Sequence, residues 1–123
     1  MNKICTSVEQ SKKLMELGID VNTADMFYPN APSPVPCVDD GNPKGDVYIP
    51  AWSISALLGL MPMIYEYEND PEDGGCQPNL CKGWDNNQWH IVYRTSLYIT
   101  DWYDDPLDAA FEMVVWLKEN GKL

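Results

Sequence analysis

Four aspartates stand close together in the segment TDWYDDPLDAAFEM, residues 100–113, beside a strongly apolar run. They are Asp101, Asp104, Asp105 and Asp108. Carboxylates at this spacing could hold a metal ion, or serve as the general acid and general base of an enzyme. They could also begin a helix, because an aspartate side chain accepts hydrogen bonds from the free N–H groups of a first turn.

The helix interpretation explains three of these four carboxylates. Asp105 precedes Pro106, and proline is favoured at the first helical position because its missing N–H would have no partner there. Asp104 or Asp105 is then the N-cap, and Asp108 falls in the first turn, where negative charge meets the positive end of the helix dipole. We therefore predict a helix over residues 105–120 and assign no role to Asp101.

One side of this predicted helix is acidic. At about 100° per residue, Asp108, Glu112 and Glu119 fall close together, with Val115 between them. We expect this side to face solvent, and the opposite apolar side to pack over a sheet. Trp116 lies at the margin, where a binding hot spot would also lie. The predicted protein-contact surface is therefore Asp108, Glu112, Val115, Trp116 and Glu119.

Histidine chemistry would have to use His90, the single histidine of the chain. His90 stands in a strand pattern, on the face opposite Trp89, Ile91 and Tyr93, with no fixed partner. The sequence contains no GxSxG, HExxH or phosphate-binding glycine loop. We predict no catalytic residue and a protein that is not an enzyme. The five tryptophans could stack on sugar rings, although large aromatics mostly supply core area.

The four cysteines are Cys5, Cys37, Cys76 and Cys81. A reducing cytosol argues against a disulfide framework. Structural zinc needs four nitrogen or sulfur ligands, so a site at Cys76 and Cys81 would have to recruit distant cysteines or the single histidine. Zinc and a local disulfide stay open as alternatives, but we predict free thiols, no bound metal and no cofactor.

Composition favours one folded domain over residues 1–123, with 45% hydrophobic and 22% charged residues. The formal net charge of -11 disfavours direct binding to nucleic acid, which requires clustered basic side chains. No apolar stretch approaches the roughly 20 residues that span a bilayer, and the N-terminus lacks the apolar region of a signal peptide. We expect a cytoplasmic protein without a membrane segment.

Patterning along the chain predicts an α+β fold, with about three helices packed on a small antiparallel sheet. A capping box, either Thr6 with Glu9 or Ser7 with Gln10, begins a helix over residues 7–17. A second helix begins at Trp52 or Ser53. Prolines and glycines predict long loops near 29–46 and 69–88. Because the first of these loops contains five prolines, we expect no β-ladder in it. Strands are predicted at 24–28, 47–49, 63–68, 89–93 and 95–102.

Three stretches of the chain carry a resemblance: TSVEQSKKLMELGIDVNTADM, IPAWSISALLGLMP and PLDAAFEMVVWLKENGKL. With these in this order, the chain resembles a group of small proteins encoded by phages, prophages and other mobile elements of gut Bacteroidales. The resemblance implies a compact α+β fold and a genomic setting, and it implies no catalytic residue. The two loops are least like the group, so a role peculiar to this chain is expected there.

The favoured function is that of a non-enzymatic accessory protein of a mobile element, acting through contacts with an unknown protein or with itself. An acidic inhibitor or nucleic-acid mimic is the alternative, and it predicts carboxylates at phosphate-like spacing on one surface. A small hydrolase or a sugar-binding domain is the third candidate, and it requires a concave pocket holding His90 or two tryptophans.

Overall fold

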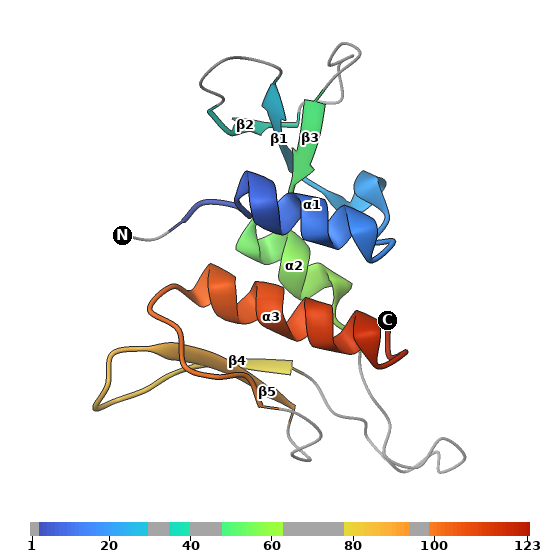
Figure 1. Cartoon of the computed structure of the whole chain (residues 1–123). Helices are drawn as coiled ribbons and strands as arrows, with labels where there is room; N and C mark the ends of the chain where they lie inside the picture. The colour runs from blue at the N-terminus through green and yellow to red at the C-terminus, as the bar shows by residue number, and fades with distance from the viewer. Residues whose placement is uncertain (1–2, 30–34, 40–47, 63–77, 94–98) are drawn as a thin grey trace.

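The structure is a computed structural model that describes residues 3–29, 35–39, 48–62, 78–93 and 99–123. It contains three helices and two small antiparallel sheets, which confirms the α+β class. The helices lie between a sheet of strand order β2-β1-β3 and the hairpin β4-β5 (Figure 1). The elements are α1 (Val8–Glu16), a 3-10 turn (Val21–Thr23), β1 (Met26–Pro29), β2 (Cys37–Val38), β3 (Tyr48–Ala51), α2 (Ile54–Leu60), β4 (Pro78–Lys82), β5 (Trp89–Tyr93) and α3 (Pro106–Glu119).

The start of α1 is fixed by the capping box that the sequence predicts. Ser7 Oγ accepts from the Gln10 backbone N–H at 3.1 Å, and Gln10 Oε1 accepts from the Ser7 N–H at 3.0 Å. The structure thus selects Ser7 over Thr6, whose hydroxyl is buried and lies 2.8 Å from Ser11 Oγ. Gly18 follows the helix at φ +86°, a conformation that glycine adopts without strain.

The start of α2 is also decided between two candidates. Ser53 is the N-cap, because its hydroxyl accepts from the Ala56 N–H at 3.2 Å. Asp25, just before β1, holds Ser53 in place by accepting from its backbone N–H at 2.8 Å and from its hydroxyl. Trp52 is left outside the helix and fully buried.

The prediction that the loop 29–46 excludes a ladder is wrong at β2. Cys37 and Val38 pair with Phe27 and Met26 of β1 in antiparallel register. Proline removes only its own backbone donor, so two consecutive non-proline residues can still pair at the edge of a sheet. Strand β3 shows the same tolerance, since it is an edge strand that contains Pro50.

The predicted loop 69–88 is likewise wrong in its second half, where β4 pairs with β5. Leu80 lies opposite Ile91, and Pro78 occupies the first position of the strand, where a missing N–H is tolerated. The turn between β4 and β5 contains Asn87 at φ +56°, a conformation that asparagine tolerates. The strand expected over 63–68 lies outside the described residues.

A further strand was expected over 95–102, and its described end is not a regular strand. Ile99 and Tyr103 form isolated antiparallel bridges with Val92 and Trp89. Between these bridges, the Ile91 N–H donates to the Thr100 side-chain oxygen at 2.9 Å instead of to a backbone carbonyl. A side chain that replaces the carbonyl interrupts the ladder, so this segment runs beside β5 without continuing the sheet.

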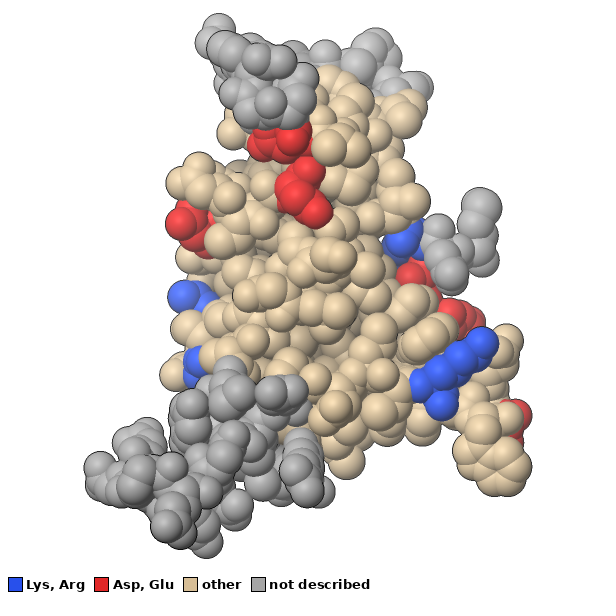
Figure 2. All heavy atoms as spheres, turned by 180° about the vertical axis from the view of Figure 1, so that it is seen from behind, with Lys and Arg blue, Asp and Glu red and all other residues tan. Residues whose placement is uncertain are grey.

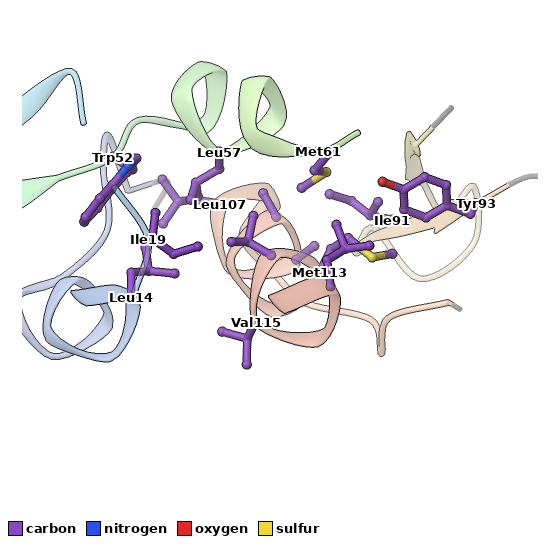
Figure 3. Packing of buried hydrophobic residues seen from close by; sticks show 14 residues of the cluster. Leu14, Ile19, Trp52, Leu57, Met61, Ile91, Tyr93, Leu107, Met113 and Val115 are labelled. Carbon is purple, nitrogen blue, oxygen red and sulfur yellow. The ribbon is translucent and has the colours of Figure 1, made fainter. Parts of the chain in front are cut away.

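Helix α3 is the centre of the hydrophobic core (Figure 3). Leucine and methionine side chains of α3 meet α1 and Trp52 on one side, α2 on another and β5 on a third. Their buried partners include Leu14, Leu57, Ile91 and Tyr93, which are all fully buried. Helix α3 therefore covers one face of the β4-β5 hairpin, and the other face points away from α3.

Candidate contact surface

The sequence predicts that the acidic side of α3 faces solvent. In the structure, other parts of the chain contact this side. Asp108 Oδ1 accepts from Lys3 Nζ and from Gln10 Nε2, each at 2.8 Å. At the other end of the helix, Glu119 lies 3.8 Å from Lys13 Nζ. The N-terminal segment and α1 thus take up both ends of the predicted stripe.

The middle of the same stripe is largely covered as well. Val115 is 9% exposed and belongs to the core, while Glu112 and Trp116 are half-buried. A helical wheel shows which residues share a side of a helix, but it cannot show which other element packs on that side. The five predicted contact residues therefore do not form one open surface.

The four aspartates of residues 100–113 do not gather into one metal or catalytic site. Asp105 is 6% exposed; its Oδ1 accepts from the Leu107 N–H at 3.0 Å, and its Oδ2 accepts from the Lys3 N–H at 2.5 Å. Asp104 is exposed and accepts from Gln88 Nε2 at 3.0 Å. Within the ranges that the structure describes, no group of three His, Cys, Asp or Glu residues could hold a metal ion.

His90 finds a partner that the sequence did not reveal. Its imidazole stacks on the Trp102 indole, with 3.9 Å between ring centroids and 10° between planes. This stack lies on the face of β5 opposite Ile91 and Tyr93, which are buried toward α3. The pairing was not foreseen because it depends on residues 99–103 returning alongside β5.

Large apolar side chains are exposed around this same hairpin. Trp84 in the turn is 97% exposed, Ile99 is 48% exposed and Trp102 is 42% exposed. Ile99 bridges to Val92, which shares the His90 face of β5 because side chains alternate along a strand. We call this set the outer hairpin surface: Trp84, His90, Val92, Ile99 and Trp102.

The turn that carries Trp84 is tightly built. A Cβ atom on Gly83 would lie 1.9 Å from the Asn86 side-chain oxygen, so a larger residue would have to displace Asn86. That oxygen accepts from the Gln88 N–H at 3.1 Å, and Gly83 N–H donates to the Gln88 carbonyl at 2.8 Å. Trp84 follows Gly83 in this hydrogen-bonded turn and is left exposed.

The margin of the outer hairpin surface is acidic. Asp85, Asp101 and Asp104 are all exposed beside the tryptophans. The carboxylates of Asp85 and Asp101 form no hydrogen bond or ion pair with any other described residue. Lys82 is the described cation nearest to Asp85 in sequence. Its Nζ lies 5.4 Å from the centroid of the Trp89 ring, on the face of β5 that packs toward α3.

The described thiols lie in three different places. Cys37 is exposed on β2, Cys81 is half-buried on β4, and Cys5 is 3% exposed near Tyr28. Burial raises the pKa of Cys5, which keeps the thiol protonated and weakly nucleophilic. Cys76 lies outside the described residues, so the zinc and disulfide alternatives at Cys76 and Cys81 stay untested.

Buried Tyr93 and half-buried Tyr28 predict a loss of stability at high pH. Burial raises the pKa of Tyr93 to about 12, and burial together with the Cys5 hydrogen bond raises that of Tyr28 to about 12. The folded state therefore holds these protons more tightly than the unfolded chain, where tyrosine titrates near 10. This contribution is fully present below pH 10 and disappears as the pH rises through 12.

Urea unfolding at several pH values between 8 and 12 measures this effect. The protein in which both tyrosines are replaced by phenylalanine should be less stable at pH 8, because Tyr28 donates to the Thr6 carbonyl and Tyr93 to the Pro62 carbonyl. Its stability should then fall less steeply above pH 10 than that of the wild type. Equal slopes for the two proteins would contradict the prediction.

The fold and this surface define a small α+β protein whose β4-β5 hairpin is covered by helix α3 on one face and presents aromatic side chains on the other. The chain matches no protein-family model, no curated protein and no solved structure. Among the described helices, none is long and apolar enough to cross a membrane.

Proposed function

We propose that the protein is a non-enzymatic accessory protein that acts through contact with another protein, and that it makes this contact with the outer hairpin surface. The observation that carries the proposal is Trp84, of which 97% is exposed on a hydrogen-bonded turn. A tryptophan buries roughly 150–250 Å² when it is covered, and tryptophans are enriched among the residues that dominate protein interfaces. Trp102 and Ile99 add exposed apolar area along the segment beside β5.

An enzyme is less well supported by the same residues. Cys81 lies opposite His90 in the β4-β5 register, which would be the start of a thiol–imidazole pair. However, Cys81 Sγ lies 3.8 Å from the Asn79 carbonyl, and the His90 ring stacks on Trp102. A nucleophilic cysteine needs a base within hydrogen-bond reach, and the described contacts of Cys81 include none.

The nucleic-acid mimic is also less well supported. Such a mimic requires many free carboxylates arrayed on one surface, whereas Asp105 and Asp108 bind the N-terminal segment and α1. On the face seen in Figure 2, described acidic side chains form small separate groups with uncharged surface between them.

The cytoplasmic location and the setting in a phage, prophage or mobile element of gut Bacteroidales belong to the same proposal. They are supported by the sequence resemblance. Self-association through the same surface is the alternative within this proposal.

Capture from a lysate of gut Bacteroidales, followed by quantitative mass spectrometry, tests the proposed function. Replacing Trp84 and Trp102 together with alanine should reduce the recovery of the specific partner at least tenfold, because each side chain is an exposed anchor that is lost. Replacing Val35 and Val38 with alanine is the control, since these are 68% and 72% exposed just before and within β2, away from the hairpin.

Equal recovery by the wild type and the tryptophan variant would contradict the proposed function. Sedimentation of the purified protein covers the alternative partner. A dimer that the tryptophan substitutions dissociate would identify a second copy of the chain as the occupant.

A further inference from the structure

We infer that the outer hairpin surface binds a basic, apolar peptide segment of its partner. In this arrangement Trp84, Ile99 and Trp102 contact apolar side chains, while Asp85 and Asp101 pair with lysine or arginine. The inference rests on the proposed function and adds the chemical class of the partner.

The geometry places the aromatic and acidic groups at the same end of the hairpin. β4, β5 and residues 99–103 run side by side, and Tyr103 bridges to Trp89, one residue from the end of the turn, so Trp102 lies near the turn that carries Trp84. The hydrogen bond from Gln88 to Asp104 ties the end of the turn to the segment that carries Trp102. One extended peptide segment could therefore contact both the turn that carries Trp84 and the segment that carries Trp102.

The charge at the margin decides which kind of segment fits. Asp85 and Asp101 are exposed and form no ion pair with another described residue, and their carboxylates attract cationic side chains. A cationic side chain can also lie over an exposed tryptophan ring, where the negative face of the ring attracts it. A basic segment thus gains from both features of the surface, whereas an acidic one is repelled by the margin.

The same charge argues against a second copy of this chain. A two-fold contact through the outer hairpin surface would bring Asp85, Asp101 and Asp104 of one copy close to their counterparts. Like charges at an interface are unfavourable, and the net charge of -11 adds to the repulsion. A basic partner removes this conflict.

Selection from a phage-displayed library of random dodecapeptides on the purified protein tests the inference. The protein with Trp84→Ala and Trp102→Ala serves as the counter-selection, because it has the same net charge. We expect the peptides that prefer the wild type to carry a net positive charge together with apolar residues. Enriched peptides that are neutral or acidic would overturn the inference, and so would a failure to enrich any peptide.

Calorimetry with the enriched peptides measures the contribution of the acidic margin. Asp85→Asn with Asp101→Asn should weaken binding about fivefold, as expected for two partly exposed ion pairs. Glu9→Gln with Glu16→Gln removes the same charge from exposed positions of α1 and should change affinity less than twofold. An equal effect of the two double variants would show attraction by net charge alone and would overturn the inference.

Circular dichroism and thermal unfolding establish that each variant is folded. The two proposals fail in different ways. If a lysate protein is captured in a tryptophan-dependent manner but its binding ignores Asp85→Asn with Asp101→Asn, the function stands and the basic partner is wrong. If capture is independent of the tryptophans, the proposed function itself is wrong.

Discussion

Replacing Trp52 with alanine is expected to lower the free energy of unfolding by about 3–5 kcal/mol, the range found for large aromatic side chains removed from a core. Trp52 is fully buried and lies among Leu14, Ile19 and Leu57 (Figure 3). It stands between the end of β3 and the cap of α2, so the cavity would open where α1, α2 and the first sheet meet. A small domain has only about 5–15 kcal/mol of stability, so the variant should be partly unfolded near 37 °C.

Two further substitutions show what the tryptophan contributes. Trp52→Phe keeps most of the buried area but loses the hydrogen bond from the indole N–H to Thr23 Oγ1 at 2.9 Å, and it should cost about 1 kcal/mol. Trp84→Ala makes the same change as Trp52→Ala at a 97% exposed position and should alter stability by less than about 0.5 kcal/mol. Urea unfolding followed by circular dichroism measures all three. A similar cost for Trp52→Ala and Trp84→Ala would contradict the buried position of Trp52.

Replacing Asp105 with alanine is expected to lower the free energy of unfolding by about 2–3 kcal/mol. Its carboxylate caps α3 through the Leu107 N–H and also accepts from the Lys3 N–H, which lies 102 positions earlier in the sequence. The substitution removes the cap and leaves a partly buried donor of the N-terminal segment without its partner. Both the last helix and the first residues of the chain should therefore loosen.

Asp104→Ala is the matched control for this prediction. Asp104 is exposed and makes one side-chain hydrogen bond, to Gln88, so its loss should cost less than about 0.5 kcal/mol. Hydrogen exchange should show faster exchange at the start of α3 and near Lys3 in the Asp105 variant only. A larger cost for Asp104→Ala than for Asp105→Ala would mean that the cap has been assigned to the wrong residue.

These two residues also show why the region of residues 100–113 is structural. Asp105 and Asp108 use their carboxylates to bind the N-terminal segment and α1, and Asp104 binds Gln88. Asp101, for which no role is predicted from the sequence, lies at the margin of the outer hairpin surface. The acidic segment thus anchors α3 on one side and borders the proposed contact surface on the other.

Local chemistry determined the helix ends of this protein. Capping side chains and the Asp-Pro pair act on atoms within a few residues, so the sequence limits the N-cap of α1 to Thr6 or Ser7 and that of α3 to Asp104 or Asp105. The turn at Asn87 follows in the same way from the ease with which asparagine adopts positive φ. The α+β class follows from these elements and from the alternating pattern of β5.

The strands and the surfaces were decided by the tertiary structure. Whether Cys37 and Val38, or Pro78–Lys82, form strands depends on the backbone that lies beside them, and no pattern within those short segments reveals it. The acidic side of α3 could be recognised in the sequence, but its burial against Lys3, Gln10 and Lys13 required the chain ends to meet. The outer hairpin surface exists because residues 99–103 return beside β5 and bring Trp102 onto His90. Contacts between residues near in sequence are fixed by local geometry, whereas contacts between distant ones are fixed only when the whole core packs.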